Sequence, residues 1–315
     1  MKPEEKGLVV KSTGKEYWIE TNEHKIIKCV LRGAFRNQNI KTTNPIAVGD
    51  HVIFTIDKDD MGTIIHILPR NNYIYRKSIN LSKTIHIIAA NIDIAFLVIS
   101  LIEPRTPLGF IDRFLVAAEA FRIPICILFN KNDLYRQEEK QLEEHLKNIY
   151  QPLNYTCLSI SALTNNNTAN LIHLMEGKIS LFCGQSGVGK SSLINCIAPE
   201  LQLKTGQIST YNQKGKHTTT FAQMFHLPFE GYIVDTPGIK EFGLIAYKKE
   251  EVGHYFPEIL AVMSNCKFNN CTHTHEPHCA VKQAVENNQI AKSRYNNYLS
   301  IINNEDIDRS DWQLK

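Results

Sequence analysis

Eight consecutive residues have the types and spacing of a phosphate-binding loop: Gly184-Gln185-Ser186-Gly187-Val188-Gly189-Lys190-Ser191. Glycines let such a loop turn its backbone N–H groups onto phosphate oxygens, and the start of the following helix adds partial positive charge. We expect Lys190 to reach the β- and γ-phosphates of a nucleotide and Ser191 to bind Mg²⁺. The sequence therefore predicts phosphate contacts from Gly184 to Ser191.

This loop requires a strand before it and a helix after it. The apolar run Ile179–Cys183 is predicted to be the buried strand, and the segment Ser192–Ile197 is predicted to be helical. A glycine turn without a ligand is the alternative interpretation, and the agreement between motif and context argues against it.

A second motif indicates that the bound base is guanine. Asn130-Lys131-Asn132-Asp133 directly follows the apolar run Ile123–Phe129, and ligand contacts in α/β proteins gather at such strand ends. The Asp133 carboxylate can accept hydrogen bonds from the ring N–H and the exocyclic amine of guanine, which adenine does not offer in that arrangement. The stem of Lys131 can lie over the base. Alone, the same string is compatible with a turn after a strand.

The dipeptide Ser161-Ala162 is a second candidate for reading guanine, through a backbone amide. It follows the next apolar run, Thr156–Ile160, and precedes the phosphate-binding loop by one strand–helix unit. Two residues carry little information by themselves, so this assignment depends on their position.

Two further stretches are predicted to lie near the γ-phosphate. Asp235-Thr236-Pro237-Gly238 closes the apolar run Tyr232–Val234, which would place Asp235 near Mg²⁺ and the Gly238 N–H at the γ-phosphate. In the preceding loop, one of three consecutive threonines is expected to bind Mg²⁺. We take Thr219, and Thr218 and Thr220 remain alternatives.

The residue after Gly238 is Ile239, where many GTPases carry a glutamine that orients water. Because isoleucine cannot orient water, we expect slow intrinsic hydrolysis. His217 is the local candidate for the missing catalytic group. Lys190 of the phosphate-binding loop is the other predicted catalytic residue.

The order of the motifs departs from that of ordinary GTPases, since the guanine motifs precede the phosphate motifs. Such a circular permutation can preserve the folded site, because the termini of compact domains often lie close together. It also joins the Asp235–Gly238 segment directly to the C-terminal region. A nucleotide-dependent change can therefore act on whatever that region binds.

Three thiolates and one imidazole, from Cys266, Cys271, His273 and Cys279, form a closed tetrahedral set suited to structural Zn²⁺ rather than catalysis. His275 and His278 compete with His273 as the fourth ligand. Three buried free cysteines beside a histidine-rich loop are the alternative interpretation. A reducing compartment argues against disulfides.

The residue pattern changes twice along the chain and predicts a multidomain α/β protein. Residues 1–69 alternate short β-rich runs with turns and predict a small β-barrel. Residues 70–243 alternate apolar strands with helical stretches, as parallel βα units do. Residues 244–315 show no strand pattern, but they contain the cysteine cluster and a helical segment, Val281–Ile302.

The net charge of +3 is too small to predict a nucleic-acid partner by itself. No acidic residue occurs between His24 and Gly49, however, and a β-barrel surface of this kind can bind RNA phosphates, with Phe35 as a stacking residue. The basic residues of this stretch are Lys25, Lys28, Arg32, Arg36 and Lys41, and Arg70, Arg76 and Lys77 form a further basic group. A solvated basic loop is the alternative.

Nothing in the sequence predicts membrane insertion. Met1–Val10 is charged and lacks the apolar core of a signal peptide, and the uncharged apolar run Ile94–Ile102 is far shorter than a membrane span. We expect a cytoplasmic, monomeric protein.

Together, the permuted motif order, the preceding β-barrel and the cysteine–histidine spacing resemble the ribosome small subunit-dependent GTPase A family, RsgA, also called YjeQ. The resemblance covers essentially the whole chain. It implies an OB-fold domain that binds RNA (1–69), a circularly permuted P-loop GTPase domain (70–243) and a C-terminal zinc-binding helical domain (244–315). It implies GTP or GDP as ligand with Mg²⁺, phosphate contacts that extend to Ser192, and one structural Zn²⁺. It also implies the small ribosomal subunit and its rRNA as partners.

One residue departs from the family pattern. Lys216 stands where the family has an arginine in its Gly-Arg-His-Thr-Thr run, which keeps the charge but loses the bidentate fork. Two other classes of protein remain compatible with the residues alone: a P-loop ATPase or small-molecule kinase, and a zinc-stabilised RNA-binding protein with a vestigial nucleotide site.

Overall fold

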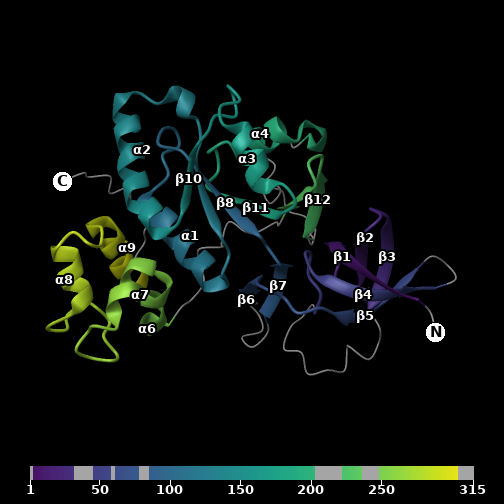
Figure 1. Cartoon of the computed structure of the whole chain (residues 1–315), viewed down its shortest axis with the longest axis horizontal. Coiled ribbons are helices and arrows are strands. Elements are labelled where there is room, and N and C mark those ends of the chain that lie inside the picture. The colour runs from purple at the N-terminus through teal and green to yellow at the C-terminus, as the bar shows by residue number, and fades with distance from the viewer. Residues whose placement is uncertain are drawn as a thin grey trace, which may run out of the picture. The chain divides into compact units, whose positions relative to one another are not determined.

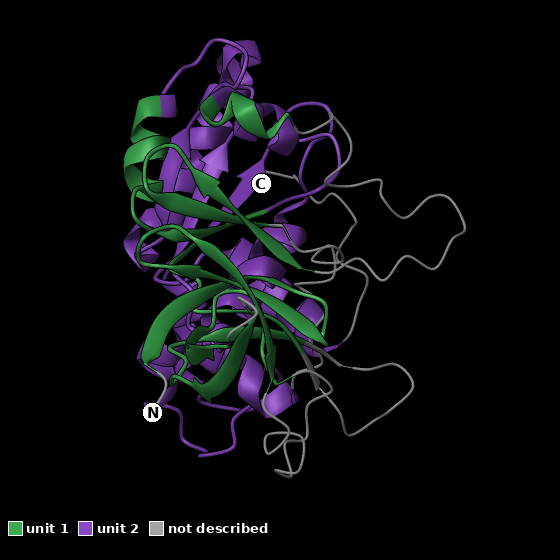
Figure 2. Ribbon diagram, turned by 90° about the vertical axis from the view of Figure 1, so that its right-hand side faces the viewer, with its two compact units in different colours: residues 1–94, 169–182, 197–238 green, residues 95–168, 183–196, 239–315 purple. Residues whose placement is uncertain are grey.

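The computed structural model describes residues 3–31, 45–57, 61–77, 85–202, 222–235 and 248–303. The chain forms two compact units (Figure 2). The first comprises residues 1–94, 169–182 and 197–238, and the second comprises residues 95–168, 183–196 and 239–315. Each unit is therefore assembled from three separate stretches of sequence.

Five strands near the N-terminus form a closed barrel (Figure 1). They are β1 (Glu4–Ser12), β2 (Glu16–Thr21), β3 (Ile26–Leu31), β4 (His51–Ile56) and β5 (Gly62–Ile67). The order is β1-β2-β3-β5-β4, and pairing of β1 with β4 closes the barrel. Inward-facing residues such as Val9, Ile19 and Phe54 fill its core. The predicted OB-fold barrel is confirmed.

The first unit also contains two antiparallel hairpins. The strand β6 (Tyr73–Lys77) pairs with β7 (Ile85–Ala90), and β12 (Gln223–Leu227) pairs with β13 (Gly231–Asp235). The strand β11 (Ile179–Cys183) runs parallel to β13, and β12 meets β1 at the pair Lys11–Gln223. Most of α3 (Thr168–Met175) and the short 3₁₀ helix η4 (Pro199–Leu201) belong to this unit as well.

A tight turn before β4 contacts the end of β7. Gly49 has φ +86°, and a Cβ there would lie 2.0 Å from the Ala90 carbonyl oxygen, so only glycine fits. Beside it, the Arg70 guanidinium donates to both carboxylate oxygens of Asp50 at 2.6 Å. Arg70 is thus an internal ion-pair partner, not part of an exposed basic surface as the sequence suggested.

The second unit contains three parallel strands and the helices that follow them. The strands are β8 (Ile94–Ile99), β9 (Ile125–Phe129) and β10 (Thr156–Ser159). The helices are α1 (Leu108–Phe121), α2 (Gln137–Tyr150) and α4 (Lys190–Ile197), with 3₁₀ helices η2 (Asn132–Leu134) and η3 (Gln151–Leu153). The predicted apolar run Ile123–Phe129 therefore contains β9, and the run Thr156–Ile160 contains β10.

Short helices make up the described C-terminal region: α6 (Lys249–Val252), η6 (Gly253–Tyr255), α7 (Pro257–Met263), α8 (Ala280–Glu286) and α9 (Lys292–Ile302). Phe256, Ile259 and Tyr298 form their core, and Val116 of α1 belongs to the same apolar cluster. The C-terminal helices therefore pack against α1.

One sequence prediction was wrong in detail, and one strand was missed. The segment Val281–Ile302 is two helices rather than one, because Asn288 has φ +57° and the chain turns there. The strand β12 was not predicted. Among the described residues, no helix has the length and apolar character needed to cross a membrane.

Candidate nucleotide and metal sites

The phosphate-binding loop lies between β11 and α4, and backbone conformation explains two of its glycines. Gly184 has φ +145°, and a Cβ at this position would lie 2.2 Å from the Val98 carbonyl oxygen. Gly189 has φ +96°, and a Cβ there would lie 2.4 Å from Asn130 Nδ2. Both conformations disfavour side chains; the backbone contact at Gly184 also forbids one, and a side chain at Gly189 would have to displace the Asn130 amide. The loop is thus built in contact with β8 and with the guanine motif.

Lys190 is the first residue of α4, and its side chain folds back over the loop. Its Nζ atom donates to the carbonyl oxygens of Gly184 at 2.8 Å and Gln185 at 2.6 Å. Lys190 and Ser191 are both mostly buried. The ammonium group is therefore held inside the loop.

Asn130 connects the three motifs of the second unit. Its Nδ2 atom donates to the Val188 carbonyl oxygen at 2.8 Å, and its Oδ1 atom accepts from the Ala162 N–H at 3.4 Å. The residue is only 2% exposed, so both bonds are shielded from water. Asn130 thus fixes the phosphate-binding loop relative to both guanine motifs, a role that the sequence pattern alone did not reveal.

The other residues of the guanine motif are accessible and held in place. Lys131 has φ +64° and donates from Nζ to the Glu103 carbonyl oxygen at 2.6 Å. Asp133 is exposed, and one carboxylate oxygen accepts from the Ser161 hydroxyl. Ser161 is fully buried and accepts from the Leu163 N–H at 3.2 Å. The carboxylate of Asp133 is therefore oriented by the second guanine motif.

Most of the residues that were predicted to surround the γ-phosphate lie outside the described part of the chain. Asp235 ends β13 in the first unit, and only its backbone is described. His217, Thr218, Thr219, Thr220, Lys216, Gly238 and Ile239 lie outside the described residues. Their roles stay predictions.

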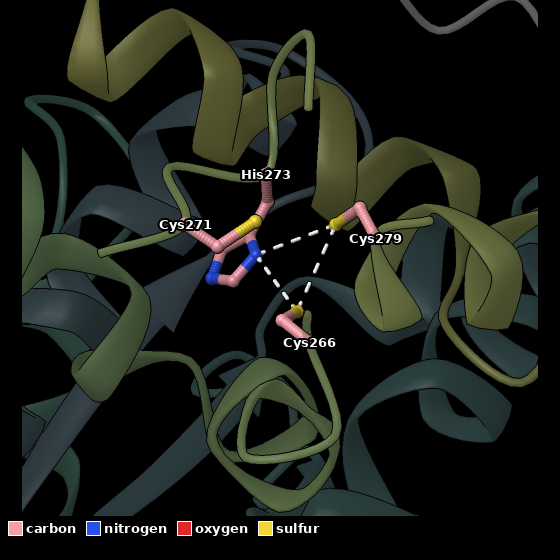
Figure 3. A group of neighbouring side chains, drawn as sticks. All are labelled: Cys266, Cys271, His273 and Cys279. Atoms are coloured by element: carbon pink, nitrogen blue, oxygen red, sulfur yellow. Dashed lines mark hydrogen bonds between the residues drawn. The ribbon is translucent and has the colours of Figure 1, made fainter. Parts of the chain in front are cut away.

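The four predicted zinc ligands form one cluster (Figure 3). The Nδ1 atom of His273 lies 3.6 Å from Cys266 Sγ and 3.5 Å from Cys279 Sγ, and these two sulfur atoms are 3.9 Å apart. All four ligand atoms, including Cys271 Sγ, lie within 4.8 Å of one another. Zinc bonds of about 2.3 Å to sulfur and 2.0–2.1 Å to nitrogen, at tetrahedral angles, separate ligand atoms by roughly 3.5–3.8 Å. The donor set fits Zn²⁺.

The cluster selects His273 among the three candidate histidines. His275 and His278 are outside it, and His275 Nδ1 instead lies 2.9 Å from the Thr274 hydroxyl. Burial lowers the pKa of His273, which keeps its imidazole neutral, as a metal ligand must be.

Polar contacts support the loop that carries these ligands. The Glu276 carboxylate accepts from the backbone N–H groups of Thr272 at 2.7 Å and Thr274 at 2.9 Å. Burial alone would raise the pKa of Glu276, but hydrogen bonds, chiefly from Thr272, outweigh it and lower the pKa to about 2. On α9, the Tyr295 hydroxyl donates to the His273 carbonyl oxygen at 2.6 Å. The ligand loop is thus attached directly to α9.

A buried ion cluster that the sequence did not indicate joins the C-terminal helices to α1. The Arg294 guanidinium of α9 donates to Asp112 of α1 at 2.7 Å and to Glu258 of α7 at 2.6 Å and 3.1 Å. Tyr150 and Asn297 also donate to the Asp112 carboxylate, at 2.9 Å and 2.6 Å. Arg294 and Asp112 are each 1% exposed. Both carboxylates raise the Arg294 pKa against the opposing effect of burial, so it stays charged.

The lysines of the predicted basic stretch that are described have acidic neighbours. Lys25 pairs with Glu23 and Lys28 with Glu16, each at 2.7 Å. Arg32, Phe35, Arg36 and Lys41 lie outside the described residues. Within the described barrel, these lysines are therefore partly neutralised, which weakens the argument from charge alone.

Three features define the class of protein: guanine motifs that precede the phosphate-binding loop, a five-stranded barrel at the N-terminus and a Cys₃His cluster near the C-terminus. This class is a circularly permuted GTPase with an OB-fold and a metal-binding region. The family models for the RsgA GTPase and the RsgA N-terminal domain match residues 67–245 and 6–64. The chain belongs to the RsgA GTPase family and is a GTP hydrolase. This confirms the resemblance predicted from the motifs, and an ATPase or a vestigial nucleotide site is no longer a competing interpretation.

Similar proteins cover nearly the whole chain. The small ribosomal subunit biogenesis GTPase RsgA of Bacteroides fragilis is 48% identical over 301 residues, 96% of this chain and 97% of that protein. The RsgA of Flavobacterium johnsoniae is 48% identical over 303 residues, 95% and 93% of the two chains. Among solved structures, YjeQ from Thermotoga maritima has a TM-score of 0.79 at 36% identity, covering 96% and 98%. YloQ, a circularly permuted GTPase, has a TM-score of 0.75 at 30% identity, covering 96% and 95%.

Proposed function

We propose that this protein hydrolyses GTP during late maturation of the small ribosomal subunit, and that binding to the subunit and its rRNA stimulates hydrolysis. The observation that carries the proposal is the arrangement around Asn130, whose side chain fixes the phosphate-binding loop against both guanine motifs. The names of its relatives, small ribosomal subunit biogenesis GTPases, supply the partner. The protein acts as a cytoplasmic monomer.

In this proposal, Asp133 and the Ala162 backbone read guanine, and Lys131 lies along the base. The phosphates lie on the backbone N–H groups of residues 184–192. Lys190 neutralises charge on the β- and γ-phosphates, and Asp235 and the Gly238 N–H act beside the γ-phosphate. Ser191 and Thr219 would hold Mg²⁺, which polarises phosphate oxygens.

Because Ile239 cannot orient water, His217 is proposed to position the attacking water when the subunit is bound. This assigns slow hydrolysis to the free protein and faster hydrolysis to the complex. In this proposal, the domain before residue 69 contacts RNA and the domain from there to residue 243 hydrolyses GTP. The C-terminal domain carries the zinc region.

The test is GTP turnover by the purified protein, measured alone and with increasing amounts of small or large ribosomal subunits. We expect small subunits to raise the rate strongly and large subunits to leave it near the basal value. Lys190→Ala should lower the stimulated rate by roughly 10²-fold or more, because an electrostatic group at the transferring phosphate is removed. His217→Ala should lower the stimulated rate more than it weakens GTP binding. Equal turnover with and without small subunits would contradict the proposed partner.

Zn²⁺, if held by the Cys₃His cluster, would stabilise the ligand loop and supply no reaction step. Replacing Cys271 by Ser should therefore lower the zinc content measured by mass spectrometry while leaving GDP affinity nearly unchanged. We also expect weaker binding to small subunits and less stimulation of hydrolysis, since the loop is attached to α9 through Tyr295.

Cys196→Ser is the matched control, because Cys196 is a half-buried free thiol outside the cluster. It should keep its zinc and its response to small subunits. A Cys271→Ser protein that lost zinc but was stimulated normally would remove the metal region from the coupling.

A further inference from the structure

A second group of metal-ligating side chains lies in the first unit, apart from the cysteine cluster. Glu20 is near the end of β2, His24 is in the turn between β2 and β3, and His226 is on β12. One ligand atom from each of these side chains lies within 4.8 Å of the other two. Two imidazoles and a carboxylate therefore converge from the barrel and from the β12–β13 hairpin.

Glu20 is an unusual residue for its position, because carboxylates are rarely buried without a charged partner. Its side chain is 7% exposed, and its Oε1 atom lies 2.7 Å from His24 Nδ1. The nearest partner on its own hairpin is thus an imidazole, whose charge depends on protonation. The side chain of His24 is 63% exposed, so this ring can turn towards a ligand.

Tyr232 is a second partner of the Glu20 carboxylate. Its hydroxyl donates a hydrogen bond to the Glu20 carboxylate. An outer partner of this kind orients a carboxylate ligand and is typical of metal sites.

The position of His226 is fixed by backbone pairing and by ring contacts. His226 is the direct antiparallel partner of Tyr232. Its ring centroid lies 5.2 Å from those of both His24 and Tyr232, with interplanar angles of 71° and 83°. The imidazole of His226 therefore packs edge-on against both other rings, with a ring nitrogen within 4.8 Å of a Glu20 carboxylate oxygen.

We propose that Glu20, His24 and His226 bind a divalent transition metal ion of the Zn²⁺, Co²⁺ or Ni²⁺ type. Two imidazole nitrogens and one carboxylate oxygen are the donors that these ions accept, whereas Mg²⁺ and Ca²⁺ prefer oxygen ligands. His24 and His226 are exposed, so solvent can complete the coordination.

The metal would connect the barrel to the β12–β13 hairpin, which ends at a residue predicted to lie near the nucleotide. The hairpin β12–β13 ends at Asp235, and β12 otherwise meets the barrel strand β1 at the pair Lys11–Gln223. Binding at this site would thus stabilise the described contact between the predicted RNA-binding barrel and the segment before Gly238. The ion binding itself does not depend on the proposed ribosomal function.

The test uses the full-length protein with zinc already bound at its cysteine cluster, to which Co²⁺ is added. We expect one further equivalent of Co²⁺ to bind with visible d–d absorption but without thiolate-to-cobalt charge transfer, because this site contains no sulfur. His226→Ala and His24→Gly should each weaken this binding by at least the roughly 10–100-fold that loss of an outer partner alone costs. Glycine suits position 24, where φ is +59°.

His173→Ala is the control, since His173 is 85% exposed and lies outside both clusters. It should bind Co²⁺ as the unchanged protein does. The proposal is overturned if no further Co²⁺ binds, if the His226→Ala and His24→Gly variants bind as well as the control, or if the only new signal is thiolate charge transfer. Circular dichroism of each variant establishes that the barrel is folded.

Discussion

Replacing Asp133 by Asn is expected to weaken GDP binding by about 10²- to 10⁴-fold, because two hydrogen bonds to a charged group, each contributing about 1.5–3 kcal/mol, are lost. The amide of asparagine presents N–H donors where guanine also presents donors. Xanthine carries a carbonyl oxygen at the position of the exocyclic amine. Affinity for xanthosine diphosphate should therefore rise while affinity for GDP falls.

The surroundings of Asp133 indicate that its replacement by Asn leaves the fold of the site unchanged. The Ser161 hydroxyl donates to the carboxylate, and the amide oxygen of an asparagine can accept the same bond. Asn130, which connects the loops, is untouched by the change. The variant is thus expected to fold normally and to differ only at the base.

Affinities for GDP, xanthosine diphosphate and ADP are to be measured by calorimetry for Asp133→Asn and for Glu144→Gln. Glu144 is an exposed carboxylate of α2, and its replacement makes the same chemical change away from the site. The control should keep the original order of affinities. Unchanged GDP affinity in Asp133→Asn would mean that this carboxylate does not read the base.

The parts of the site predicted from sequence are those in which neighbouring residues act together. The loop from Gly184 to Ser191 and the motif at Asn130 are contiguous, so their chemistry is visible in the order of residue types. The zinc ligands lie in one short segment as well. The barrel strands were predictable because their inward faces alternate with outward faces along each strand.

Contacts between distant segments could not be predicted in the same way. Asp112 and Arg294 are 182 positions apart, and each looks like an ordinary charged residue of an amphipathic helix. His226 lies on β12, whose partly exposed residues gave no strong strand pattern. The break between α8 and α9 depends on Asn288 adopting positive φ, which the local sequence permits but does not require.

The buried ion cluster has a consequence for how the metal region is connected to the nucleotide site. The segment between β8 and α1 lies against two of the three motifs of the second unit: the Glu103 carbonyl oxygen accepts from Lys131, and a Cβ added at Gly187 would lie 3.2 Å from Pro104. This segment leads directly into α1, which carries Asp112. Arg294 therefore attaches α9, which also holds the loop of the Cys₃His cluster, to the helix that follows this segment, in addition to the covalent connection after Gly238.

Replacing Arg294 by Met is expected to destabilise this attachment by about 3–5 kcal/mol, because it leaves two buried carboxylates without their cation. Methionine fills a similar volume, so the lost energy comes mainly from Asp112 and Glu258 rather than from a cavity. The loss corresponds to roughly 10²- to 10⁴-fold less protection against amide hydrogen exchange in α7 and α9.

Native-state hydrogen exchange followed by mass spectrometry measures the protection of each helix separately. A single unfolding curve of a multidomain protein cannot separate the helices in this way. Lys292→Met, an exposed change on the same helix, should leave protection unchanged. Removing the carboxylates as well, in a triple variant with Asp112→Asn and Glu258→Gln, should recover much of the protection, since no buried charge is then unpaired. If Arg294→Met exchanged like Lys292→Met, the buried ion cluster would not be what attaches the C-terminal helices to α1.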